Sequence, residues 1–323
     1  MSAGAACGAA VKADGYGLGA TEVARRLAAV GCRDFFVSNW PEAEALAPLG
    51  LSVSVLHGVR EEDMGVALTG IARPVLNTPA QVARWRAAGG GACDVMVDTG
   101  MNRLGLSVAQ VDGGLVDGLA IDTLMSHLAR AEEDGAEARA MNERQRAALA
   151  GLAGRTDARR LSLANSAGIG LGAGYRFDLT RPGLALYGGV PRADMAGELA
   201  QVAHPQAQVI QHRLVPAGET VGYNATWTAR ADTEVAILNI GYADGYLRAF
   251  SDRGSGSWGG ADLPVIGRVS MDLLAIDASG APGLGEGEWV GIAFDLPAAS
   301  AATGLSEYEL LTAMGARYER FWV

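Results

Sequence analysis

The chain has 323 residues, of which 49% are hydrophobic and 19% are charged, a composition that is ordinary for a globular enzyme of one or two domains. The formal net charge of -10, without any cluster of lysines and arginines, argues against a nucleic-acid-binding surface. The sequence begins without a signal-peptide pattern and contains no apolar run long enough to span a bilayer. We therefore expect a cytoplasmic protein that binds neither nucleic acid nor membrane.

Cysteine and histidine usage excludes two further classes. Cys7, Cys32 and Cys93 are widely spaced and form no C-x-x-C pair, so neither a disulfide framework nor a zinc site is predicted. Three of the four histidines, at positions 57, 204 and 212, share no metal-ligand spacing. We expect a reducing setting and no metal.

The stretch 9–19 carries the first chemical signal. A short apolar run ending at Val11 predicts a buried strand, and Lys12 then opens a turn too rich in glycine to be a helix. A lysine at the carboxyl end of a barrel strand is a candidate Schiff-base nucleophile. Taken alone, the stretch is better explained by a surface lysine at a loop edge, so further signals have to decide.

The next part of the chain alternates strand-like and helical segments. Further strands are predicted near 35–37, 53–56, 74–77, 95–97, 121–125, 161–163 and 179–186. Helices are predicted near 22–29, 42–46 and 61–68, after Pro79, and over 137–152. About eight strand-like units in this alternation favour an α/β fold of the (β/α)8 TIM-type barrel over an open sheet.

The pattern changes near residues 187–199. Later segments alternate in the β manner over 209–214, 233–240, 263–276 and 289–294, and a short helix is predicted over 306–314. We therefore expect a barrel domain over residues 1–196, followed by a smaller, mostly β C-terminal domain over residues 197–323.

Chemically useful side chains follow several predicted barrel strands. They are Lys12 with Tyr16, the run 98–103, His127, the run 165–167 and the run 181–184. Because the carboxyl ends of parallel strands share one face, these groups should gather there. Ser166 and Gly183 follow the last two strands, where such barrels often hold a phosphate, and barrel closure makes them neighbours of Lys12. This geometry suits pyridoxal phosphate, whose aldehyde would meet the lysine.

Six motifs, in order along the chain, resemble those of the alanine racemase family. They are VKADGYGLG at 11–19, DTGMNRLG at 98–105, RPGLALYG at 181–188, VGY at 221–223, GYADG at 241–245 and GRVSMD at 267–272. The resemblance implies a pyridoxal-phosphate-dependent racemase that interconverts L-alanine and D-alanine for peptidoglycan synthesis. It also implies a homodimer whose two subunits share their active sites.

The resemblance implies a role for each matching residue. Lys12 would hold the cofactor and act as one acid/base, while Tyr223 of the partner subunit would act on the opposite face of the substrate. Arg181 would bond the pyridine nitrogen and keep it unprotonated, because a guanidinium does not readily give up its proton. Arg103 would help to position Tyr223 and the substrate carboxylate.

The remaining implied contacts concern the cofactor and the substrate. Tyr16, Ser166, Gly183 and Leu184 would hold the phosphate, His127 would lie by the cofactor ring, and the partner subunit's Met271 and Asp272 would line the substrate site. Two of these have plainer explanations from sequence alone: His127 fits a core histidine equally well, and Tyr223 fits a strand aromatic until its motif context is considered.

The sequence departs from the family pattern in several places, among them Leu18, where a histidine is common. Met96 stands where many members have a carbamylated lysine that orients the arginine, so Arg103 must be held by another group, such as a bound anion or a carboxylate. Ala316 replaces a phosphate-binding tyrosine, for which Tyr318 is a candidate substitute. Only eleven residues precede Lys12, fewer than is usual, which predicts a chain less stable than an extended version and deficient in activity.

Two alternatives to an alanine racemase remain open. A racemase for serine or for a broader range of amino acids would differ around Met271 and Tyr242. A non-catalytic pyridoxal-phosphate-binding protein would need Lys12 but not Tyr223, so the presence of both speaks against it.

Overall fold

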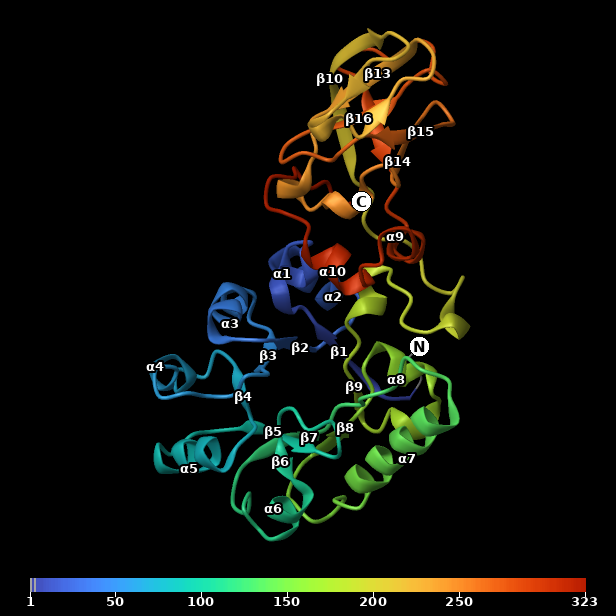
Figure 1. The fold of residues 1–323 in the computed structure, drawn as a ribbon. Coiled ribbons are helices and arrows are strands. Elements are labelled where there is room, and N and C mark those ends of the chain that lie inside the picture. Colours follow the sequence, from blue (N-terminus) through green and yellow to red (C-terminus); the bar gives the residue numbers. More distant parts are fainter. Residues whose placement is uncertain (1, 3) are drawn as a thin grey trace. The chain divides into compact units, whose positions relative to one another are not determined.

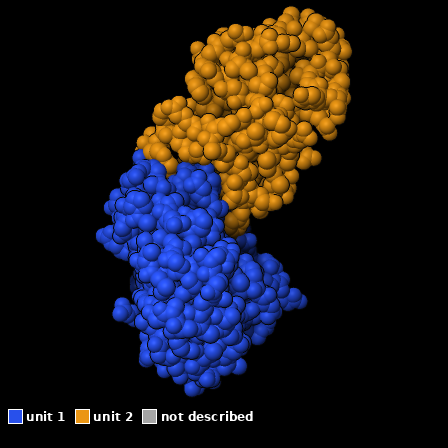
Figure 2. Space-filling view, turned by 90° about the vertical axis from the view of Figure 1, so that its left-hand side faces the viewer, with its two compact units in different colours: residues 1–186, 191–198 blue, residues 187–190, 199–323 orange. Residues whose placement is uncertain are grey.

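The computed structural model describes residues 2 and 4–323 (Figure 1). The chain forms two compact units, one of residues 1–186 and 191–198 and the other of residues 187–190 and 199–323 (Figure 2). Among the described residues, no helix is both long enough and apolar enough to cross a membrane.

Parallel strands close into a barrel in the first unit, as the alternating pattern predicted. They are β1 (Ala6–Ala10), β2 (Asp34–Val37), β3 (Ser52–Val55), β4 (Arg73–Leu76), β5 (Cys93–Asp98), β7 (Ile121–Met125), β8 (Arg160–Ser162) and β9 (Leu179–Thr180). Neighbours run β4-β3-β2-β1-β9-β8-β7-β5, and pairing of β4 with β5 completes the circle. A short strand, β6 (Leu106–Ser107), adds to β5.

Helices surround the strands in Figure 1, and their starts are encoded locally. They are α2 (Ala20–Ala29), α3 (Trp40–Leu46), α4 (Met64–Ala67), α5 (Pro79–Ala87), α6 (Val108–Asp112), α7 (Ala136–Ala150) and α8 (Ser166–Gly170). The side chain of Asn39 caps α3 and that of Thr78 caps α5, each by accepting a backbone N–H in the first turn. Ser107 and Gln110 form a capping box at α6.

Apolar side chains from five barrel strands pack together. The cluster consists of Phe36, Val75, Met96, Met125 and Leu179, all at most 8% exposed. Met96 is therefore part of the hydrophobic core. Such layers of side chains fill the interior of a barrel and hold the strands at fixed positions around it.

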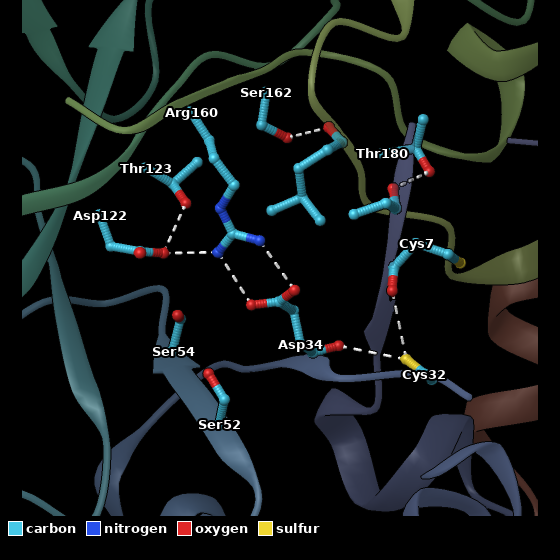
Figure 3. Close-up of polar contacts among 12 residues, drawn as sticks. Cys7, Cys32, Asp34, Ser52, Ser54, Asp122, Thr123, Arg160, Ser162 and Thr180 are labelled. Carbon is cyan, nitrogen blue, oxygen red and sulfur yellow. Dashed lines mark hydrogen bonds and ion pairs between the residues drawn. The ribbon is translucent and has the colours of Figure 1, made fainter. Parts of the chain in front are cut away.

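A network of charges occupies the amino-terminal end of the barrel (Figure 3). Arg160 donates to both carboxylate oxygens of Asp34 at 2.9 Å and also pairs with Asp122. Arg73 lies 3.6–3.8 Å from the carboxylates of Asp34, Asp94 and Asp122. These residues are the first or second of their strands, so the network lies at the end of the barrel opposite Lys12.

The second unit is mostly β, as its alternating segments predicted. Six strands form a closed barrel in the order β10 (Gln206–Val215), β13 (Thr233–Leu238), β16 (Leu274–Asp277), β15 (Ala261–Ile266), β14 (Ser255–Trp258) and β17 (Trp289–Ile292), counted over the described residues. The unit also contains the hairpin β11 (Thr220–Val221) with β12 (Trp227–Thr228), and the helices α9 (Leu296–Thr303) and α10 (Glu307–Thr312).

Several predicted boundaries are wrong. β9 ends at Thr180, and residues 184–187 form a 3-10 turn rather than the end of a strand, because Pro182 has no N–H for a strand ladder. The segment predicted over 263–276 is two strands, separated by a loop that begins at Gly267 with φ 67°. Sequence pattern did not predict the short strands β6 and β14.

Candidate active site

Lys12 lies two residues after the end of β1, in a turn with left-handed backbone. The structure records residues 12–16 as a short helix, α1 (Lys12–Tyr16), where we expected none. Ala13, Asp14 and Tyr16 have φ of 52–55°, a left-handed conformation that costs energy for residues other than glycine. Two carboxylates hold the turn: Glu42 accepts the N–H of Ala13 at 2.8 Å, and Asp14 accepts the N–H of Ala20 at 2.8 Å. The lysine is thus presented by a fixed turn.

The surroundings of Lys12 favour its neutral amine. Burial lowers the pKa of Lys12, and the nearby positive charge of Arg103 lowers it further, while Glu42 acts in the opposite direction. A lysine must lose its proton before it can attack a carbonyl, so a lowered pKa favours formation of a Schiff base.

Ser166, Gly183 and Tyr16 converge near this lysine's end of the barrel. The Oγ of Ser166 accepts the backbone N–H of Gly183 at 2.9 Å and that of Ala185 at 3.2 Å. A Cβ on residue 183 would lie 2.1 Å from the Tyr16 hydroxyl oxygen, so only glycine lets that hydroxyl approach. Burial raises the pKa of Tyr16 to about 12, which keeps the hydroxyl protonated.

These groups have the hydrogen-bonding capacity that a bound phosphate requires. The protonated Tyr16 hydroxyl is a donor, and a hydroxyl such as that of Ser166 can donate its own proton while it accepts others. Leu184, the residue after Gly183, is 3% exposed. The residues present therefore fit the phosphate group of pyridoxal phosphate.

Arg181 is a buried cation, and its hydrogen bonds within the described residues go to neutral acceptors. Its guanidinium donates to the Oγ of Ser162 and to the backbone oxygen of Ser126, and it lies 6.0 Å from the ring centroid of Phe36. Burial lowers the pKa of Arg181 to about 10, with Asp94 acting in the opposite direction. The side chain therefore stays charged at neutral pH and can contact a ring nitrogen without giving it a proton.

His127 follows β7 and is held neutral. Burial first, and then the positive charges of Arg181, Arg103 and Lys12, lower the pKa of His127 to about 3. Three cations acting on one imidazole show that the residues predicted after β1, β5, β7 and β9 do gather at one end of the barrel. A neutral, partly buried imidazole could pack beside the planar ring of the cofactor.

Arg103 lies in an ordered loop but is itself exposed. Asp98 fixes the start of that loop, because its Oδ1 accepts the N–H groups of residues 100, 101 and 102 at 2.8, 2.9 and 3.1 Å. Within residues 2 and 4–323, no carboxylate lies within ion-pair distance of Arg103. The thioether of Met96 is buried in the core and supplies no negative charge that could orient Arg103.

Tyr223, Met271 and Asp272 belong to the second unit. Tyr223 is 68% exposed and lies between β11 and β12, and Met271 is 53% exposed. Asp272 accepts a hydrogen bond at 2.7 Å from Arg317, whose guanidinium also pairs with Asp244. The sequence analysis missed Arg317, because no spacing pattern marks a residue that joins two loops distant in the sequence.

Comparisons with known proteins agree along the whole chain. The family model for the alanine racemase N-terminal domain matches residues 1–191, and that for the C-terminal domain matches residues 202–322. Alanine racemase of Acidiphilium cryptum is 42% identical over 324 residues, which cover 96% of this chain and 90% of that protein.

Solved structures give the same result. Alanine racemase from Bartonella henselae with covalently bound pyridoxal phosphate has a TM-score of 0.88 and 33% identity, over 99% of this chain and 93% of that one. Biosynthetic alanine racemase from Pseudomonas aeruginosa has a TM-score of 0.87 and 31% identity, over 99% of this chain and 92% of that one.

The fold and the site define the class of pyridoxal-phosphate-dependent amino-acid racemases, which are isomerases. Within that class, the chain belongs to the alanine racemase family. Its cofactor is pyridoxal 5'-phosphate.

Proposed function

We propose that the chain interconverts L-alanine and D-alanine by a two-base mechanism, as a cytoplasmic homodimer that supplies D-alanine for peptidoglycan. The observation that carries this proposal is the position of Lys12. It lies at the carboxyl end of β1, with a pKa lowered by burial and by Arg103, at the end of the barrel that holds the Ser166–Gly183 corner and Arg181.

Two bases on opposite faces are what racemisation requires. One base removes the proton from the α-carbon, and the other returns a proton from the far side, so that the configuration inverts. Bound pyridoxal phosphate supplies the electron sink that makes the α-proton acidic. We assign proton transfer on one face of the α-carbon to the Nζ of Lys12. Proton transfer on the opposite face is assigned to the hydroxyl of the partner subunit's Tyr223.

Other residues orient the reacting groups. Tyr16, Ser166, Gly183 and Leu184 would hold the phosphate, and His127 would lie beside the ring. Arg181 would contact the ring nitrogen and keep a proton from it, which weakens the electron sink and limits side reactions. Arg103 would hold the substrate carboxylate and position Tyr223, while the partner's Met271 and Asp272 would line the substrate site.

The test is to incubate the purified chain with L-alanine and pyridoxal phosphate and to separate the products by chiral chromatography. We expect D-alanine from the wild-type chain and none from the Lys12→Ala variant. A parallel incubation with L-serine addresses the substrate. D-serine without D-alanine would show that the proposed substrate is wrong, and D-alanine from Lys12→Ala would remove the lysine from the mechanism.

A further inference from the structure

Gln145 is a buried amide whose contacts lead toward the active-site end of the barrel. It lies on α7 and is 1% exposed. We propose that Gln145 is a positioning residue that fixes two catalytic loops together, the loop after β5 that carries Arg103 and the loop after β7 that carries His127. The proposal rests on the proposed roles of those two residues.

Both the oxygen and the nitrogen of the Gln145 side-chain amide form hydrogen bonds. Its Oε1 accepts the backbone N–H of Ala129 at 2.9 Å, and its Nε2 donates to the backbone oxygen of His127 at 2.9 Å. The Nε2 also lies 3.4 Å from the Oγ1 of Thr99. The N–H of Ala129 needs an acceptor, and the backbone oxygen of His127 needs a donor. The side-chain amide of Gln145 satisfies both groups when its oxygen faces Ala129 and its nitrogen faces His127.

Thr99 extends the connection to the first loop. Its hydroxyl bonds that of Ser126 at 2.7 Å, and the backbone oxygen of Ser126 accepts a hydrogen bond from Arg181. Thr99 also immediately follows Asp98, whose Oδ1 accepts the N–H groups of residues 100–102. One buried amide thus connects the start of the Arg103 loop with the backbone of His127. Through Thr99 and Ser126, the same network reaches Arg181.

The same helix provides a matched comparison. Asn142 lies three residues earlier on α7 and is also fully buried, and its Nδ2 donates to the backbone oxygen of Arg130 at 3.0 Å. It anchors the chain after His127 but bonds neither His127 nor Thr99. Loss of Asn142 should therefore perturb the packing of α7 without releasing the two catalytic loops.

Supporting residues matter because small displacements of catalytic groups are costly. A misplacement of about 1 Å can lower a rate by about a hundredfold. Arg103 has no ion pair of its own in the described part of the chain, so its position depends on the loop that carries it. Gln145 therefore supports an arginine that the buried Met96 cannot orient.

The experiment compares Gln145→Met with Asn142→Leu, each an apolar side chain of similar size, in the pyridoxal-phosphate-loaded enzyme. Hydrogen–deuterium exchange reports the backbone amides of residues 99–103 and 127–129, and steady-state kinetics report KM and kcat for L-alanine. Thr99→Val, which removes only a hydroxyl, is a second variant in case Gln145→Met does not fold.

For Gln145→Met we expect exchange at least about tenfold faster in both loops and a KM for L-alanine raised about tenfold, because the Arg103 loop is released. Thr99→Val should speed exchange in residues 99–103 alone, and Asn142→Leu should change neither loop nor KM. Unchanged exchange in Gln145→Met and Thr99→Val, or equal effects in Asn142→Leu, would overturn the proposal.

Faster exchange with unchanged KM and kcat would also overturn it, since the loops would then move without consequence for the reaction. The exchange measurement needs no turnover. Absence of D-alanine from the wild-type enzyme would therefore count against the proposed function and leave the structural part of this inference separately testable.

Discussion

The hydroxyl of Ser166 and the backbone N–H of Gly183 are joined by a hydrogen bond of 2.9 Å, which ties the start of α8 to the segment after β9. We expect Gly183→Ala to disrupt this corner, because the new methyl would lie 2.1 Å from the Tyr16 hydroxyl. Displacing that hydroxyl should weaken pyridoxal phosphate binding about tenfold, and overpacking should cost about 1–3 kcal/mol of folding free energy.

Titration of the apoenzyme with pyridoxal phosphate, followed by absorbance, measures the first effect. Gly174→Ala is the control, because a Cβ at that glycine meets only one atom, at 4.0 Å. Equal cofactor affinity in the two variants would contradict the steric argument.

Substituting Tyr223 by Phe should abolish racemisation and leave the cofactor bound. The hydroxyl is the proposed second base, whereas the 68% exposed ring makes little contribution to the core of its unit. Chiral analysis of the product and the absorption spectrum of the bound cofactor measure the two properties. Tyr246→Phe is the control, because it removes a buried hydroxyl of the same unit that has no hydrogen-bond partner among the described residues, and it should remain active. Full activity in Tyr223→Phe would exclude Tyr223 from the mechanism.

His127 should make the apoenzyme less stable as the pH falls. The folded state lowers the pKa of His127 to about 3, whereas an unfolded histidine has a pKa of about 6.5. Between these two pH values, the unfolded state therefore binds one more proton than the folded state. Stability therefore rises with pH across this window. Acidification from pH 7 to pH 5 should remove about 2 kcal/mol through this residue.

The measurement is urea unfolding at both pH values for wild type and for His127→Gln, which keeps a neutral polar side chain. The difference between the two proteins in their loss of stability isolates the imidazole from other titrating groups. Identical losses would show that His127 is not held neutral in the folded apoenzyme.

Asp34→Asn should destabilise the barrel by about 3 kcal/mol, because Arg160 would lose a bidentate carboxylate in a site where charges are largely shielded from water. Glu133→Gln removes a partner of Arg130 at the surface and should cost less than about 1 kcal/mol. Urea unfolding at pH 7 measures both. Similar losses in the two variants would show that the network at the amino-terminal end of the barrel contributes no more than a surface ion pair.

The fold was largely predictable from sequence because its signals are local. Apolar runs gave the barrel strands, and residues such as Asn39 and Thr78 mark helix starts through bonds within one turn. The predicted end of β9 was wrong, because hydrophobic periodicity alone does not distinguish a strand from a 3-10 turn of apolar residues.

For the candidate site, the sequence predicted which barrel strand each residue follows, but not the contacts between the residues. Parallel strands bring Lys12 and His127 to one end whatever the details of packing, and the pKa of His127 reflects the charges of Lys12, Arg103 and Arg181. The contacts of Gln145 and Arg317 were not predictable, because each joins loops far apart in the chain and neither lies in a recognisable motif. The individual catalytic and binding roles stay predictions until the variants are made.

The pairing of β1 with β9 has a consequence for synthesis of the protein. Ala6 is paired with Leu179, 173 residues later, although the other edge of β1 pairs with the nearby β2. At translation rates of about 5–20 residues per second, the free edge of β1 waits roughly 10–35 s for its partner. An unpaired strand edge is a template for association with other chains, so we expect the nascent polypeptide to be most prone to association until β9 completes the ring of strands.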